Sequence, residues 1–178
     1  MQLLELETLQ QWRRVLPVAR PSSVRMPKLG LSLLFVDSRI DVEVSDTVLS
    51  SIAPFRMGIQ NTIGVRLSRQ RGGLLQISDV LQWLIAIDSL YIVGQGEGDC
   101  IWLGNACLRS SMLLRYQHSL ARWRQYGGCD RGELPIWFCG NAALMQALAQ
   151  GLTHQFQQLT RCPVTALEWN HSHSLGLE

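Results

Sequence analysis

The 178-residue chain has the length of one domain, and its 47% hydrophobic and 17% charged residues exclude an intrinsically disordered protein. Its net charge of +2 is too small to predict a nucleic-acid partner from bulk electrostatics. No stretch approaches the ~18 uncharged apolar residues of a membrane span, so we expect no membrane insertion.

The cysteines bear on metal binding and on location. They stand at positions 100, 107, 129, 139 and 162, with no CxxC pair and no short Cys/His ligand spacing. This pattern argues against a zinc site. Glu5 and Glu7 occupy the N-terminus, where a secretory signal would have a basic region. We therefore interpret the thiols as reduced and expect a cytoplasmic protein.

The first third of the chain predicts a helix, a loop and paired strands. Leucines and Trp12 at helical spacing predict an N-terminal docking helix over 1–17, followed by a loop over 18–30. Leu31–Asp37 is an apolar run typical of a buried strand, and Ile40–Val44 alternates as its hairpin partner would. A short helix capped by Ser45 or Asp46 and a strand over Thr62–Ser68 are expected next.

The middle of the chain predicts two helices around a hairpin. We expect Ser78 or Asp79 to begin a helix whose apolar residues, extending to Ile87, cover nearly its whole circumference. Leu90–Val93 and Ile101–Leu103 are expected to pair around the sequence GQGEGD. That loop lacks a following GK[ST] and carries two acidic residues, which favours a turn over a phosphate site. A second helix is predicted over Ser110–Tyr126.

The clearest unit is Leu134–Leu159, in which a strand passes through a Cys-Gly pivot into a helix. Gly140 allows a sharp turn and Asn141 is a good N-cap. Apolar residues follow at spacings of three and four: Met145, Leu148, Leu152, Phe156 and Leu159. Cys162–Trp169 predicts a last strand, and a flexible tail is expected over 170–178. The whole chain, 1–178, thus predicts a single α/β or α+β domain, a mixed β-sheet with helices packed on it.

The pivot Cys139-Gly140-Asn141 resembles a segment near the C-terminus of the ferredoxin–NADP reductase superfamily, where a strand ends in Cys-Gly and a helix follows at the nicotinamide side. It is equally similar to the strand-Gly-helix near the end of actin-like ATPase folds. The flavin-binding barrel pattern of the first and the acidic phosphate motifs of the second are missing, and a generic α/β unit explains both likenesses. We assign neither family. A protein that binds a nucleotide or dinucleotide at these three residues is the alternative function.

Catalytic and metal chemistry find little support in the sequence. A thiolate at Cys139 would be favoured by the helix N-terminus, but the apolar Trp137 and Phe138 beside it favour a buried structural thiol. His171 and His173 could share a metal, yet two ligands on a terminal tail bind weakly. No carboxylate pair has catalytic spacing. We therefore expect no catalytic residue, no metal and no cofactor, while a small-molecule ligand stays compatible with the sequence.

The functional prediction rests mainly on the missing catalytic pairings, and it places a partner on the outer face of the helix expected over Ser110–Tyr126. Arg115, His118 and Arg122 fall on one line of that face, and we call these three residues the basic strip. A merely solvated face is the competing explanation, because most charged faces have no partner. The missing catalytic pairings predict a cytoplasmic, non-catalytic module that binds another protein, as an assembly factor, adaptor or complex subunit, and we expect that partner to dock on the basic strip.

Overall fold

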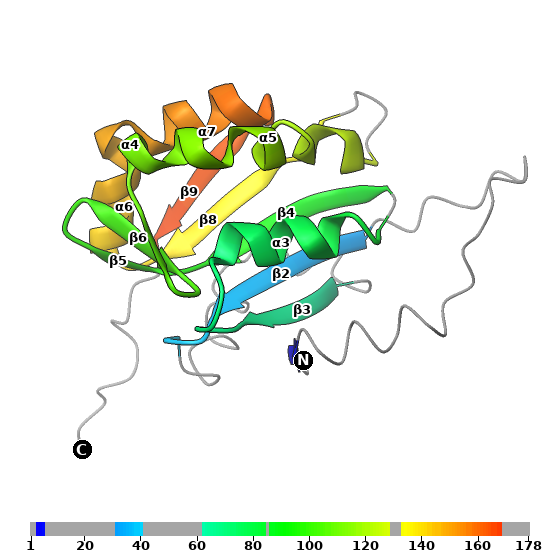
Figure 1. Ribbon diagram of the computed structural model, residues 1–178, viewed down its shortest axis with the longest axis horizontal. Helices are drawn as coiled ribbons and strands as arrows, with labels where there is room; N and C mark the ends of the chain where they lie inside the picture. Colours follow the sequence, from blue (N-terminus) through cyan, green and yellow to red (C-terminus); the bar gives the residue numbers. More distant parts are fainter. Residues whose placement is uncertain (1–2, 6–30, 41–61, 85, 129–132, 169–178) are drawn as a thin grey trace, which may run out of the picture.

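The computed structural model describes residues 3–5, 31–40, 62–84, 86–128 and 133–168. They form two main layers, a β-sheet and a layer of helices that covers one face of it (Figure 1). Six strands build that sheet in the order β1-β3-β2-β4-β8-β9, and every neighbouring pair is parallel. Their bounds are Leu3–Glu5 (β1), Leu31–Asp37 (β2), Thr62–Leu67 (β3), Ile87–Val93 (β4), Ile136–Gly140 (β8) and Val164–Glu168 (β9).

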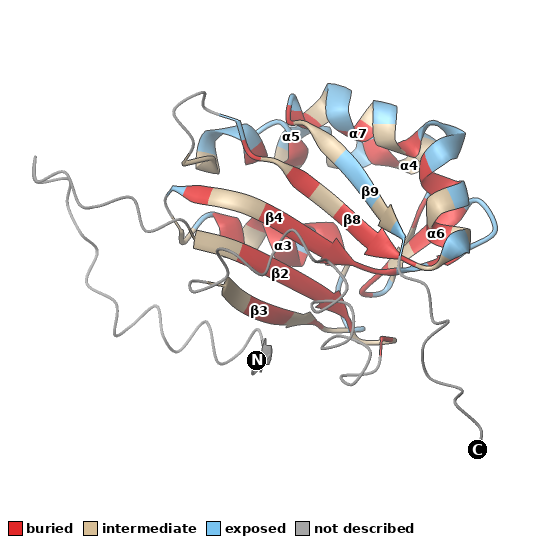
Figure 2. Cartoon of the chain, turned by 180° about the vertical axis from the view of Figure 1, so that it is seen from behind, coloured by how far each residue is buried: buried red, intermediate tan, exposed pale blue. Residues whose placement is uncertain are grey.

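The helices lie on one face of this sheet, as the front and back views show (Figures 1 and 2). In chain order they are α3 (Gly73–Leu81), α4 (Ser110–Leu113), the 3-10 helix η3 (Leu114–Tyr116), α5 (Gln117–Leu120), the 3-10 helix η4 (Trp123–Tyr126), α6 (Ala142–Ala147), the π-helical turn η5 (Leu148–Leu152) and α7 (Thr153–Thr160). The main core lies between the two layers. It joins Phe35 and Phe138 of the sheet to Ile77, Leu120 and Phe156 of the helices.

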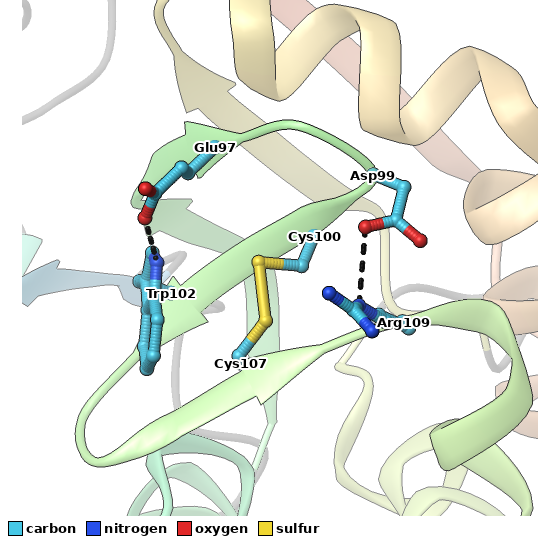
Figure 3. Close-up of a disulfide and its surroundings, with 6 residues drawn as sticks. All are labelled: Glu97, Asp99, Cys100, Trp102, Cys107 and Arg109. Atoms are coloured by element: carbon cyan, nitrogen blue, oxygen red, sulfur yellow. Dashed lines mark hydrogen bonds and ion pairs between the residues drawn. A yellow bond between two sulfur atoms is a disulfide. The ribbon is translucent and has the colours of Figure 1, made fainter.

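A second, antiparallel sheet lies at the carboxyl ends of the parallel strands. It consists of β5 (Gln95–Glu97), β6 (Cys100–Leu103) and β7 (Ala106–Leu108), and it begins two residues after β4 ends. A disulfide between Cys100 and Cys107 joins β6 to β7 (Figure 3). Parallel and antiparallel pairing are therefore both present, in separate sheets.

Several predictions of the fold are confirmed. The chain forms a single α/β domain with helices packed on its sheet, and β2 has the expected bounds. Asn141 caps α6, since its side-chain oxygen accepts a hydrogen bond from the Leu144 N–H at 3.1 Å. The last strand, β9, pairs in parallel with β8. The predicted stripe of the following helix is inward, with Leu148, Leu152 and Phe156 buried.

Two predictions in the first half are wrong. Leu3–Glu5 is a strand paired with β3, so no helix spans 1–17; a short apolar run suits an edge strand as well as a helix. The β2 hairpin with Ile40–Val44 is also wrong, because β3 and β4 occupy both edges of β2 in parallel. Residues 6–30 and 41–61, which include the predicted loop and short helix, lie outside the described residues.

Three predictions in the middle need correction. The helix predicted to begin at Ser78 or Asp79 is α3, and it begins at Gly73. The apolar residues expected to continue this helix to Ile87 are divided between two elements, because α3 ends at Leu81 and Ile87 begins β4. The hairpin around Gly98 and Asp99 exists, but Gln95–Glu97 supplies its first strand. This happens because Leu90–Val93 is paired with β2 and β8 within the parallel sheet.

The predicted continuous helix over Ser110–Tyr126 is broken into α4, η3, α5 and η4. Tyr116 leaves the helical region, with φ −101° and ψ 5°, and separates η3 from α5. The longer helix after Asn141 is also interrupted, at Gly151, whose φ of 99° is in the left-handed region. Finally, the interpretation that all thiols are reduced is wrong for Cys100 and Cys107, which form the disulfide.

Candidate functional site

The basic strip lies on the outer surface of the helical layer. Arg115 in η3, His118 in α5 and Arg122 immediately before η4 are all exposed, while Leu120 and Trp123 between and beside them are fully buried. The break at Tyr116 leaves this separation of faces intact. In the part of the chain that the structure describes, none of the three basic side chains has a hydrogen bond or an ion pair. The predicted exposure is confirmed, and partner binding stays a prediction.

A pocket of about 200 Å³ adjoins the strip and shares two residues with it. It lies where α3 packs against α5 and η4. Its lining residues are Ser78, Gln82, His118, Ser119, Arg122, Trp123 and Tyr126, and we call this site the polar pocket. The sequence analysis missed it, because Ser78 and Gln82 are distant in the chain from the other five residues.

The inner wall of the polar pocket is rigidly held. Trp123 is fully buried, and its indole N–H donates a hydrogen bond of 2.9 Å to Ser78 Oγ. The Ser78 hydroxyl in turn donates to Leu74 O at 2.8 Å. The Trp123 ring also contacts Phe156 edge to face, with ring centroids 5.6 Å apart. A wall fixed by the core in this way loses little freedom when a ligand binds.

The chemistry of the polar pocket is that of an anion site. Arg122 and His118 can supply positive charge, Ser119 and Tyr126 carry hydroxyl groups, and none of the seven lining residues is acidic. Within the described structure no hydrogen bond joins His118 to Ser78 or Ser119. The polar pocket can bind and orient a negatively charged group.

The pivot is brought together as predicted, but its polar groups are engaged within the fold. The Asn141 side-chain oxygen accepts hydrogen bonds from the N–H groups of Leu144 and Gly96, each at 3.1 Å. Gly140 is packed so closely against Gly94 O and the Leu144 side chain that a Cβ would not fit. Cys139 is buried, and burial raises the pKa of its thiol to about 12. A thiol in this state is a poor nucleophile at neutral pH.

The carboxyl edge of the sheet holds a second group of residues that the sequence analysis did not assign to a site. The connection order reverses between β2 and β4, and in open α/β sheets such a switch point is the usual place for a ligand. Here the chain itself fills it. The fully buried Asp37 at the end of β2 accepts a hydrogen bond of 2.6 Å from the Gly104 N–H, in the turn between β6 and β7.

Arg39 completes this closure. Its guanidinium donates to Asp37 Oδ1 at 3.0 Å and to Gly104 O at 2.7 Å, and it lies 4.7 Å from the centre of the Trp102 ring. Trp102 also donates its indole N–H to Glu97 at 2.8 Å, on the outer side of the hairpin (Figure 3). The signal available in the sequence was an Asp placed at the end of a buried strand.

Two further absences concern only the described residues. Among them, no group of three His, Cys, Asp or Glu side chains is placed to hold a metal ion. Nor is any helix in the same ranges long and apolar enough to cross a membrane. The predicted weak ligands His171 and His173 lie outside the described ranges.

Fold and site together define a parallel-sheet α/β domain whose switch point is filled by its own disulfide-bonded hairpin and whose helical layer carries an exposed basic strip. A family model, described as a domain of unknown function (DUF4347), matches residues 33–172. The chain therefore belongs to this family. Searches of the curated proteins and of the solved structures find no match.

Proposed function

We propose that this protein is a non-catalytic binding module, acting as an assembly factor, adaptor or complex subunit, and that a protein partner docks on the basic strip. The observation that carries the proposal is that Arg115, His118 and Arg122 are all exposed and make no hydrogen bond or ion pair with other described residues. Basic side chains without an ion pair within the fold are available to an acidic surface of a partner, and electrostatic steering by such charges raises the rate at which the two proteins associate.

An exposed apolar side chain beside the strip supports the same surface. Among the described residues, the large hydrophobic side chains that stay exposed are Leu75, at 40%, and Leu114, at 55%. Leu114 directly precedes Arg115 and belongs to the same 3-10 helix. An apolar contact next to Arg is a common combination at protein interfaces, where Arg is enriched. We therefore place Leu114 in the proposed interface.

The non-catalytic part of the proposal is supported by the state of the pivot. Cys139 is buried with a raised pKa, and Asn141 is engaged by two backbone N–H groups. The alternative, a nucleotide or dinucleotide bound at Cys139, Gly140 and Asn141, predicts a clear thermal shift with ATP, NADPH or a flavin. A ligand at 100 times its dissociation constant adds about 2.7 kcal/mol of stability. Such a shift would overturn the binding-module proposal.

A protein partner, and not a nucleic acid or a membrane, fits the small net charge of +2. We also propose a cytoplasmic location, which carries a condition on the disulfide. Cytoplasmic thiols are kept reduced, so Cys100 and Cys107 would be a dithiol there, whereas an oxidising compartment would keep them bonded. Alkylation of thiols in rapidly quenched cells decides between the two. A bonded pair in those cells would contradict the cytoplasmic location.

Affinity capture from the native host tests the proposed function. The wild-type chain is compared with the double variant Arg115→Glu/Arg122→Glu, and with Arg161→Glu as a matched reversal of an exposed Arg outside the polar pocket. Mass spectrometry should show a partner that is captured by the wild type and by Arg161→Glu but lost by the double variant. Equal capture by all three proteins would exclude the strip as the docking site.

A further inference from the structure

The polar pocket and the basic strip are continuous, since His118 and Arg122 belong to both. The basic strip is an exposed surface that could contact another surface, whereas the polar pocket is a recess with a rigid wall that could enclose a single group. Gln82, His118 and Arg122 are exposed at its mouth, and Trp123 is fully buried within. A group that enters from the strip side therefore meets the guanidinium and imidazole first and the hydroxyl groups of Ser119 and Tyr126 beside them.

We propose that the polar pocket receives the carboxylate of one Asp or Glu side chain from an acidic segment of the partner, an inference that rests on the proposed function. The lining presents hydrogen-bond donors and two basic groups without an acidic residue, which is the complement of a carboxylate. Arg122 can meet such a group with a bidentate pair, the geometry that favours Arg over Lys at carboxylate sites.

The size of the pocket supports a single side chain as its occupant. Its volume of about 200 Å³ lies below the roughly 300–1,000 Å³ of sites that enclose a cofactor or drug-sized ligand. A pocket of this volume would not enclose a whole nucleotide, whereas it would enclose the end of a Glu or Asp side chain. Arg115 lies outside the lining, where it would meet a neighbouring acidic residue of the same segment.

The internal hydrogen bonds of the wall define what remains available to the ligand. The Ser78 hydroxyl is engaged, donating to Leu74 O and accepting from the Trp123 indole. One N–H of Gln82 is engaged with Ser78 O at 3.1 Å. The donors left for a carboxylate are thus those of Arg122, His118, Ser119 and Tyr126, together with the second N–H of Gln82. Removing pocket donors should mainly increase the dissociation rate, whereas removing Arg115 should mainly decrease the association rate.

Nuclear magnetic resonance with an acetylated hexaglutamate peptide tests the pocket directly. The indole N–H resonance of Trp123 reports on the inner wall, since this group is buried and bonded to Ser78. We expect it to shift on addition of hexaglutamate and to stay unchanged with the matched hexaglutamine peptide. Tighter binding of inorganic phosphate than of hexaglutamate would overturn the assignment to a carboxylate.

Two variants separate the pocket from the strip. Ser119→Leu fills the recess without changing charge, and Arg122→Gln removes the principal donor at an exposed position that the fold tolerates. Each should weaken hexaglutamate binding about tenfold, the loss expected for a charge-assisted hydrogen bond. Arg161→Gln should leave the affinity unchanged. If Arg115→Glu and Arg122→Gln weaken binding while Ser119→Leu has no effect, the pocket proposal fails and the strip proposal stands. If no variant changes binding, both fail.

Discussion

Asp37 anchors the hairpin that fills the switch point, and Asp37→Asn should destabilise the fold strongly for an isosteric change. The fully buried carboxylate accepts from the Gly104 N–H at 2.6 Å, the Arg39 N–H at 2.9 Å and the Arg39 guanidinium at 3.0 Å. An amide has only one acceptor oxygen. The variant therefore loses about 1.5–3 kcal/mol for one charge-assisted hydrogen bond, and an unsatisfied buried N–H costs roughly 1–3 kcal/mol more. We expect a total near 3 kcal/mol.

Urea unfolding followed by circular dichroism measures this loss. With an m-value of about 2 kcal/mol per molar urea, the midpoint should fall by about 1.5 M. Asp79→Asn is the matched control, because Asp79 pairs with Arg71 at 2.9 Å while the two side chains are 34% and 50% exposed. Such a pair contributes roughly 0–1 kcal/mol. Equal midpoint shifts for the two variants would refute the assigned role of Asp37.

Three other predictions concern packing and the cysteines. Burial raises the pKa of Cys139 from 9.0 to about 12, so between these pH values the folded thiol keeps its proton while the unfolded chain loses it. The free energy of unfolding should therefore not depend on this group below pH 9 and should decline from pH 9 toward 12. In urea titrations, Cys139→Ala should remove that part of the decline. Gly96→Ala should lower the melting temperature far more than Gly98→Ala. A Cβ at Gly96 meets the α6 backbone, whereas the space around Gly98 is open and only its φ of 60° is unfavourable for Ala. Equal melting temperatures for the two variants would contradict the close packing of Gly96 on α6. Cys100 and Cys107 are seven residues apart, and reduction of their disulfide should lower the free energy of unfolding by about 2–3 kcal/mol in the same urea assay. An unchanged midpoint would show that the disulfide does not stabilise the fold.

The parts of the fold that could be predicted are those bounded by strong local signals. Gly30 precedes β2, Pro135 precedes β8, and Asn141 caps α6, so the sequence predicts where each of these elements begins. The run from Val80 to Val93 has no comparable boundary. It is divided between a helix and a strand by tertiary packing, and local pattern does not reveal the division.

The candidate site also has one part that the sequence predicts, the basic strip, and one that it does not predict, the polar pocket. Exposure of Arg115, His118 and Arg122 follows from spacing, and it survives the break at Tyr116 because Leu113 and Leu120 remain in the core. The polar pocket depends on Ser78 meeting Trp123, a contact between positions 45 residues apart. Nothing in the local sequence specifies that contact, since it is formed only when α3 packs on η4.

The association rate of the captured partner, measured as a function of salt concentration, tests the central claim most directly. Wild type and Arg161→Glu should bind at the same rate in low salt and more slowly as salt screens the strip, whose field is reduced beyond roughly 8 Å at physiological ionic strength. Arg115→Glu/Arg122→Glu should bind slowly at all salt concentrations, at an unchanged melting temperature. Association of the double variant at the wild-type rate in low salt would contradict docking on the basic strip.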